Sequence, residues 1–206
     1  MFIEINKFDI NKVKIDSIIR RFKSFEKVIP EINKLSLPGL ETQLKMAPSF
    51  RKKLIEEFKE ARKTAKLAAV LCLFYPSDSG ETNIVLILRK VYKGVHSAQV
   101  GFPGGKPENI DKSLMHTALR ETWEEIGVAS NKIKVIRQLT TIYIPPSNFQ
   151  VYPFIGISHS PITFNLQFSE VEDIIEISLL DILNDDNEVR SEVLGANRSK
   201  SFELMN

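Results

Sequence analysis

The sequence has little cysteine, no long apolar run and no excess of charge of one sign. Its single cysteine, Cys72, has no partner for an internal disulfide, which argues against a disulfide-stabilised secreted domain. No apolar run approaches the ~18 residues that a membrane helix needs. The N-terminus, MFIEINKFDINK, has scattered charges instead of a basic start followed by an apolar core, so it does not resemble a secretory signal. We therefore expect a soluble, cytoplasmic protein without a membrane partner.

The charge balance excludes a bulk electrostatic attraction to polyanions. Lys and Arg number 28 and Asp and Glu number 26, so the net charge is only +2. This gives no general case for binding nucleic acid or a membrane surface, and an anionic partner must be recognised locally. With 206 residues, 43% of them hydrophobic, the chain can bury one core and a small appendage. Cys72 lies in the apolar run LAAVLCLFY, where we expect a buried thiol.

The pattern along the chain divides it near residue 65. Amphipathic helices are expected around Val13 to Phe25 and Phe50 to Ala65, with breaks at LPGL and MAPS. From Leu67 onward the pattern is mostly strand-like, interrupted by one central helix. The expected strands are LAAVLCLFY, NIVLILR, KVIRQLTTIYI, VYPFIGIS, ITFNLQF and DIIEISLLDIL, the last running into a short helix. This order predicts an α/β or α+β fold built from layers.

The central helix, expected from about Lys112 to Ile126, carries the segment RETWEE. Glu121, Glu124 and Glu125 stand at i, i+3 and i+4, so their carboxylates share one helix face. Like charges at this spacing repel, and a cation among them would relieve the repulsion. Mg²⁺ and Mn²⁺ prefer oxygen ligands of this kind. The spacing therefore points to a divalent metal site.

A plainer interpretation is a solvated acidic face in which Arg120 pairs with Glu124 at i, i+4. The surrounding sequence favours the metal site over this interpretation. Gly127 can take the left-handed conformation that ends a helix, and the segment PGG places a flexible loop just before it. A core-facing stripe is expected on the opposite side of the helix, from Met115, Ala118, Leu119, Thr122 and Ile126.

This stretch resembles the Nudix box, which reads glycine, five residues, glutamate, seven residues and then Arg-Glu-apolar-x-Glu-Glu-x-Gly-apolar. Here Gly105 is followed after five residues by Asp111, and Arg120 comes after eight more. Aspartate thus replaces the first glutamate, one residue is inserted, and Thr122 takes a position that is usually apolar. The resemblance implies a Nudix-type α/β/α sandwich with a mixed β-sheet over residues 66–206, preceded by a helical extension at 1–65.

The resemblance also implies hydrolysis of a diphosphate with Mg²⁺ or Mn²⁺ as cofactor. Glu121, Glu124 and Glu125 would hold the metal, and Arg120 would orient them, with Asp111 as a further partner. Gly104 and Gly105 would present their backbone to the metal or the phosphates. The general base is either a glutamate of the box or one from a distant loop, where the candidates are Glu170 and Glu172.

A subgroup of Nudix proteins that hydrolyse coenzyme A is similar over further residues. In that subgroup FPGG is followed by two acidic residues, here Glu108 and Asp111, and preceded by an arginine and a histidine, here Arg89 and His96. The resemblance implies cleavage to 4′-phosphopantetheine and adenosine 3′,5′-bisphosphate. Arg89 would contact a phosphate and His96 the substrate, although either can also be an ordinary surface residue. The chain departs from the subgroup at Lys93, Gly94 and Ala98.

Basic residues for the 3′-phosphate of coenzyme A are present, although their roles are open. Lys93 and Arg51–Lys53 are candidates, but a basic helix such as FRKKLIEEFK is more often a solvated face. The altered residues leave a second substrate class open, that of other nucleoside diphosphates such as ADP-ribose or NADH. A non-catalytic nucleotide-binding module is a third interpretation, which the complete Arg120, Glu121, Glu124 and Glu125 set disfavours.

The C-terminal segment after SLLDIL lacks the closing strand and helix that the family normally has there. An apolar face would then need another cover. Three arrangements remain open: the N-terminal helices cover it, a second copy covers it in a homodimer, or the domain is truncated and less stable.

Overall fold

A computed structural model of the chain describes residues 18–39, 42, 62–90, 99–184, 187–191 and 199–202. Most of its strands form one mixed sheet, in the order β3-β2-β1-β7-β5, with β4 on β1, β6 on β7 and β8 on β2. The strands are β1 (Lys66–Pro76), β2 (Thr82–Arg89), β3 (Val100–Gly101), β4 (Gly104–Gly105), β5 (Lys134–Gln138), β6 (Ile142–Ile144), β7 (Phe149–Ile157) and β8 (Val171–Ser178). Short 3₁₀ turns lie at Arg62–Thr64, Ser130–Lys132 and Pro145–Ser147.

The centre of the sheet is the parallel pair β1 and β7, while the other pairs are antiparallel. Side chains of β1 alternate between the two faces, as they must in a strand. Leu71, Leu73 and Tyr75 belong to one core cluster, whereas Cys72 and Phe74 belong to the other. Because both faces are covered, the strand reads as a continuous apolar run. The mixed α/β layer fold expected from the sequence is confirmed.

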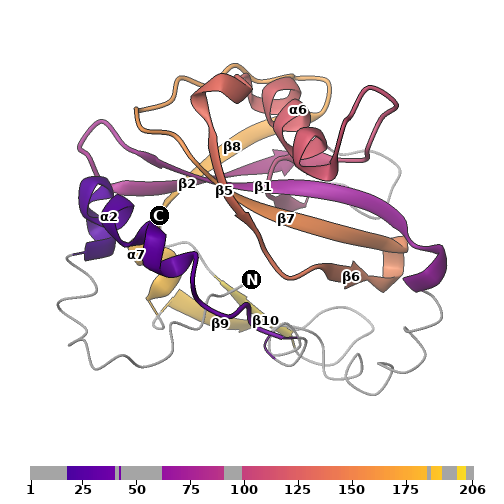
Figure 1. Cartoon of the computed structure of the whole chain (residues 1–206), viewed down its shortest axis with the longest axis horizontal. Helices are drawn as coiled ribbons and strands as arrows, with labels where there is room; N and C mark the ends of the chain where they lie inside the picture. Colours follow the sequence, from indigo (N-terminus) through magenta and orange to yellow (C-terminus); the bar gives the residue numbers. More distant parts are fainter. Residues whose placement is uncertain are drawn as a thin grey trace.

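Helix α6 (Leu114–Ile126) covers one face of the sheet (Figure 1). The Ser113 side chain caps its start by accepting a hydrogen bond from the His116 N–H, and Gly127 ends it at φ 75°. The expected helix is therefore confirmed, two residues shorter at its start. Ala118, Thr122 and Ile126 are buried as expected. Met115 is not, because it is 42% exposed, and the expectation of a core position for it was wrong.

Helices α2 (Phe22–Ile32) and α7 (Leu179–Leu183) lie on the opposite face (Figure 1). The helix expected at Val13 to Phe25 is interrupted at Arg21, whose backbone is extended and pairs with Glu81. Helix α2 starts at the next residue and continues past the expected end to Ile32, with Pro30 inside its last turn. The apolar side chains Phe22, Phe25 and Ile29 explain why it continues, since they pack on Phe74 and its neighbours in the second core cluster. The expected end at Phe25 was wrong, and residues 13–17 lie outside the described part of the chain.

Polar contacts also join α2 and the turn after it to the sheet domain. The Arg137 guanidinium donates to the carbonyls of Ile32, Asn33 and Leu35, at 3.1, 3.2 and 3.0 Å. The Thr140 hydroxyl donates to the Pro38 carbonyl at 2.7 Å. A cation on the last carbonyls of a helix also suits the negative end of its dipole. The sequence left open whether the N-terminal helices or a second chain would cover an exposed apolar face. In the structure, helix α2 covers this face of the sheet.

The segment ITFNLQF is not a strand, although its pattern alternates like one. Ile162, Phe164 and Leu166 do pack against the core under α6. However, the backbone N–H groups of Asn165 and Gln167 donate to the carbonyls of Ile126 and Glu125 at the end of α6, both at 3.0 Å. The extended segment thus satisfies the open end of a helix instead of a sheet edge.

The remaining expectations for the chain have mixed outcomes. DIIEISLLDIL forms β8 and α7 as expected, and Cys72 is buried, which raises the pKa of its thiol to about 12. The second expected helix, at residues 50–65, lies outside the described residues except for the 3₁₀ turn Arg62–Thr64. Beyond α7, β9 (Glu188–Ser191) and β10 (Ser199–Phe202) pair with each other. Among the described residues, none of the helices is long and apolar enough to cross a bilayer.

If α2 belongs to the folding unit, loss of its central side chain will destabilise the whole domain. Phe25 is 6% exposed, and its ring centroid lies 5.1 Å from that of Phe74. We expect Phe25→Ala to lower the free energy of unfolding by about 3–5 kcal/mol, through lost burial and the cavity left behind. Chemical denaturation measures this, with Phe168→Ala as the matched control because Phe168 is 65% exposed. Equal stability of the two variants would show that α2 does not contribute to the fold.

Candidate functional site

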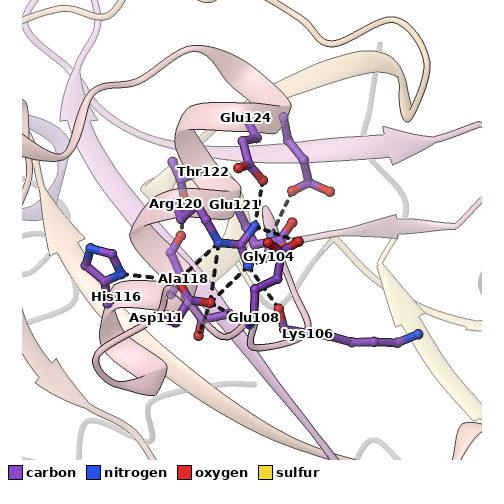
Figure 2. A network of polar contacts seen from close by, with 12 residues as sticks. Gly104, Lys106, Glu108, Asp111, His116, Ala118, Arg120, Glu121, Thr122 and Glu124 are labelled. Carbon is purple, nitrogen blue, oxygen red and sulfur yellow. Dashed lines mark hydrogen bonds and ion pairs between the residues drawn. The ribbon is translucent and has the colours of Figure 1, made fainter.

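The charged face of α6 lies against the loop of residues 104–111, and Arg120 stands between them (Figure 2). Its side chain is only 7% exposed. The guanidinium donates to Asp111 and to the Lys106 carbonyl on the loop, at 3.1 and 3.0 Å. On the helix it donates to Glu121 at 3.0 Å and to Glu124 at 2.6 Å. A planar fork with five donors suits such a set of acceptors.

Asp111 is the partner of Arg120 on the loop, and its side chain is 1% exposed. It also accepts hydrogen bonds from the Glu108 N–H and the Thr117 hydroxyl, at 2.9 and 3.0 Å, and lies 3.1 Å from His116 Nδ1. The Arg120 hydrogen bond is the main cause that holds the pKa of Asp111 well below its usual range. In turn, Asp111 raises the pKa of Arg120. The contact expected between these two residues is confirmed.

Glu125 is the most buried of the three glutamates, with a side chain that is 1% exposed. Its Oε2 accepts a hydrogen bond from the Gly104 N–H at 2.7 Å, and its Oε1 lies 3.3 Å from Arg89 Nη2. Burial raises the pKa of Glu125 to about 7, although Arg89 and Gly104 oppose that shift. The charges of Glu121 and Glu170 add to it. Burial and neighbouring negative charge therefore outweigh the favourable contacts.

Glu121 lies beside Glu125 and close to Gly105. A β-carbon on Gly105 would collide with the Glu121 carboxylate, so a larger residue there would displace that side chain. Burial is the main cause that raises the pKa of Glu121, and the negative charges of Glu124 and Glu170 contribute. The Arg120 contact lowers the pKa but does not cancel these effects.

The three glutamates of RETWEE therefore do not have equal positions. Glu124 is 43% exposed and bound to Arg120, as in the plain i, i+4 interpretation. Glu121 and Glu125 are more buried, at 14% and 1% exposed side chain, and the charge of Glu121 contributes to the raised pKa of Glu125. Within the described ranges, no group of three His, Cys, Asp or Glu side chains is arranged to hold a metal ion together. The metal site expected on Glu121, Glu124 and Glu125 stays a prediction.

Glu170 reaches the same region from the segment before β8. Its charge raises the pKa of both Glu121 and Glu125, which places it within their electrostatic range. Its backbone is held on two sides, since its N–H donates to the Gln167 carbonyl at 2.9 Å and its carbonyl accepts from the Lys90 N–H at 3.0 Å. Glu172 is an exposed residue of β8. Of the two candidates for a distant base, Glu170 is thus the one placed near the box.

Arg89 and His96, the two residues expected near the substrate, have different outcomes. Arg89 ends β2, and its Nη2 donates to the Gly104 carbonyl at 2.7 Å and faces Glu125. Its expected phosphate contact stays a prediction. His96 lies outside the described residues, together with Lys93, Gly94 and the basic segment 51–53.

Sequence reasoning missed the part that His116 and Thr117 play in the loop. Both side chains hold Asp111, from the first turn of α6. The one available signal was the capping residue Ser113 just before them, since a capped first turn brings the side chains that follow it close to the preceding loop. The contact between Gln167 and the end of α6 had no signal in the sequence pattern.

Comparisons with known proteins agree with this geometry. The family model described as NUDIX domain matches residues 65–194. A protein of Yersinia enterocolitica named "Uncharacterized Nudix hydrolase NudL" is 38% identical over 103 residues, which are 50% of this chain and 52% of that protein. "Nudix hydrolase 15, mitochondrial" of Arabidopsis thaliana is 36% identical over 59% of this chain and 43% of its own length. The chain therefore spans about half the length of these curated relatives.

Solved structures are more distant. The crystal structure of a Nudix hydrolase from M. smegmatis, RenU, is 16% identical, with a TM-score of 0.48 over 59% of this chain and 74% of that chain. Nothing about substrate or mechanism is carried over from it.

The burial of Glu125 predicts a specific dependence of stability on pH. Its pKa is raised from 4.5 to about 7, so the folded protein holds this proton more tightly than the unfolded chain. The stability from this group is present below the unfolded pKa and is lost as the pH rises through 7. We expect Glu125 to make the free energy of unfolding of metal-free protein fall by roughly 3 kcal/mol from pH 4.5 to 8.

Urea unfolding at several pH values, with Glu125→Gln beside the wild type, measures this. The variant should lose the downward slope, because its side chain does not titrate. Glu31→Gln is the control, since Glu31 is 70% exposed and paired only with Lys34 on the surface of α2. Parallel slopes for the wild type and Glu125→Gln would contradict the prediction.

Proposed function

The chain belongs to the NUDIX domain family, and from this premise we propose that it is a divalent-metal-dependent hydrolase that cleaves the diphosphate of a nucleoside diphosphate derivative. The observation that carries the proposal is the placement of two carboxylates, the buried Glu125 and the largely buried Glu121, beside the loop of Gly104 and Gly105. Neighbouring carboxylates in a desolvated region are unfavourable unless a cation or a reaction uses them.

The residues of this region fit Mg²⁺ or Mn²⁺ by their chemistry. Carboxylate oxygens are the ligands that both ions prefer, and burial is the main cause that raises the pKa of Glu121 and Glu125, with the charges of neighbouring carboxylates adding to it. Glu121 and Glu125 would hold the ion, with a backbone group of Gly105 beside them. Glu124 would act from the rim, through Arg120. When bound, the ion would neutralise phosphate charge and lower the pKa of a water molecule.

Each protein group then has a definable task. Arg120 fixes the glutamates relative to the loop by hydrogen bonds to Asp111, Glu121 and Glu124. Glu170 is our proposed general base, because it is the acidic side chain from outside the box whose charge reaches both buried glutamates. It would accept the proton of the attacking water. Gly104 and Gly105 carry no side chain, which lets the loop lie close to β1 and to Glu121.

Among substrates, we propose coenzyme A or a derivative of it, with 4′-phosphopantetheine and adenosine 3′,5′-bisphosphate as products. Support comes from the segment FPGG with Glu108 and Asp111 after it and Arg89 and His96 before it. The departures at Lys93, Gly94 and Ala98 keep ADP-ribose and NADH as alternatives. His96 stays a predicted substrate contact.

Compartment and assembly stay predictions. A reducing compartment such as the cytoplasm suits the buried thiol of Cys72. A homodimer is less needed than the sequence suggested, because α2 and α7 cover the second face of the sheet in the described part of the chain.

A product assay decides between the substrates. We expect coenzyme A, incubated with Mg²⁺ or Mn²⁺ and resolved by chromatography, to yield adenosine 3′,5′-bisphosphate, while ADP-ribose and NADH remain intact. Turnover of the latter two alone would keep the hydrolase and discard the coenzyme A assignment. If none of the three is hydrolysed under either metal, the non-catalytic nucleotide-binding interpretation gains support.

Substitution of single glutamates tests the assignment of roles. Glu121→Gln keeps the side-chain shape but removes a charge from the proposed metal site. We expect kcat to fall by more than the roughly 10–100-fold that loss of a supporting group costs. Glu124→Gln should lose less, since Glu124 is 43% exposed and bound to Arg120. Glu31→Gln on the distant α2 is the control. Wild-type turnover by Glu121→Gln would remove this residue from the site.

A further inference from the structure

Arg89 lies where helix α6, the loop of residues 104–111 and the segment that carries Glu170 meet. Its Nη2 donates to the Gly104 carbonyl at 2.7 Å and lies 3.3 Å from Glu125 Oε1. The Gly104 N–H donates to the other oxygen of Glu125 at 2.7 Å. The three residues therefore close a triangle in which both polar backbone atoms of Gly104 are engaged.

The backbone around Arg89 is itself fixed. Its N–H donates to the Gln99 carbonyl at 3.1 Å, and the next N–H, that of Lys90, donates to the Glu170 carbonyl at 3.0 Å. The register between β2 and β8 shifts between Leu88 and Arg89. Such irregularities redirect a side chain relative to the regular strand. The guanidinium thus starts from a rigid point that also carries the backbone of Glu170.

Gly104 has no side chain that could hold the loop in place, so the loop must be held by other residues. Its φ is 151°, and a β-carbon there would collide with the backbone of Ala69 and Val70 on β1. The position thus admits no side chain that could pack and hold the loop against α6. Beyond its pairing with β1, the loop is held there by hydrogen bonds to Arg89 and Glu125.

We propose that Arg89 is a positioning residue that fixes the Gly104–Gly105 loop and the Glu125 carboxylate relative to each other. The inference rests on the proposed function, because that geometry is what the proposed hydrolysis uses. It assigns Arg89 a task different from a phosphate contact. Loss of the guanidinium would leave a carboxylate that is 1% exposed without its cation. Lysine would not replace it, since one ammonium on a shorter side chain cannot reproduce the planar fork.

The loop can be observed directly, without substrate or metal. Only two glycines of the sequence follow a proline, Gly39 and Gly104. Labelling the full chain with ¹³C-carbonyl proline and ¹⁵N-glycine therefore selects two amide signals, with Gly39 as an internal control. In Arg89→Met and in Arg89→Lys, we expect the Gly104 amide to exchange its hydrogen at least about tenfold faster, and Gly39 to be unchanged.

Kinetics separate positioning from a phosphate contact. On whichever diphosphate the wild type hydrolyses, both Arg89 variants should lose about 10–100-fold in kcat, with KM within about threefold. The matched control is Lys90→Met, which removes a cation from the neighbouring residue and should leave Gly104 exchange and kcat at the wild-type values.

Three results would overturn the proposal. One is Gly104 exchange that is unchanged in Arg89→Met, which decides the matter even if the wild type hydrolyses none of the substrates. A second is a raised KM with kcat intact and recovery in Arg89→Lys, which is the signature of a phosphate contact. The third is faster Gly104 exchange with kcat intact, which would make the triangle a structural feature only.

Discussion

The guanidinium of Arg120 lies almost buried between the loop of residues 104–111 and α6, and its donors reach groups on both. On an isolated helix the acidic residues of RETWEE would repel each other. Here one rigid fork compensates Glu121, Glu124 and Asp111 together. Hydrogen bonds between ionised groups are stronger and more directional than neutral ones, so this contact fixes orientation as well as charge. The distance between loop and helix, on which every other contact of the site depends, follows from it.

Arg120 does not reach Glu125, and this asymmetry gives the site its chemistry. The other three carboxylates are paired with Arg120, whereas Glu125 faces Arg89 and a backbone N–H. Burial is the main influence on the pKa of Glu125. Glu121 and Glu170 add negative potential to the same region. A protein keeps such an arrangement at a cost in stability, which functional sites commonly show. The gathering of carboxylate oxygens in this region is the physical reason for expecting a cation there.

Local signals in the sequence were enough for α6 and for the central strands. The spacing of the glutamates and Gly127 each act within one or two helical turns, so their meaning does not depend on the rest of the fold. The burial of Met115 was predicted wrongly because the apolar pattern shows which face of a helix is directed to the core. It does not show how far the sheet extends beneath the first turn. The segment 162–168 was misread because alternation reports burial on one side and not the identity of the hydrogen-bond partner. Likewise, the Glu125 and Gly104 contacts of Arg89 join residues that only the tertiary fold brings together.

Strand β1 links the two halves of this structure. One of its faces packs under α6 and the other packs under α2. Helix α2 comes from residues 1–65, which differ in sequence pattern from the rest of the chain. The loop of residues 104–111 is attached to the same strand, since Ala69 and Val70 pair with Gly105 and Gly104. Protein interiors are close-packed, so a strand held from both sides can shift little. The position of the loop relative to Glu121 and Glu125 therefore depends on both helical layers.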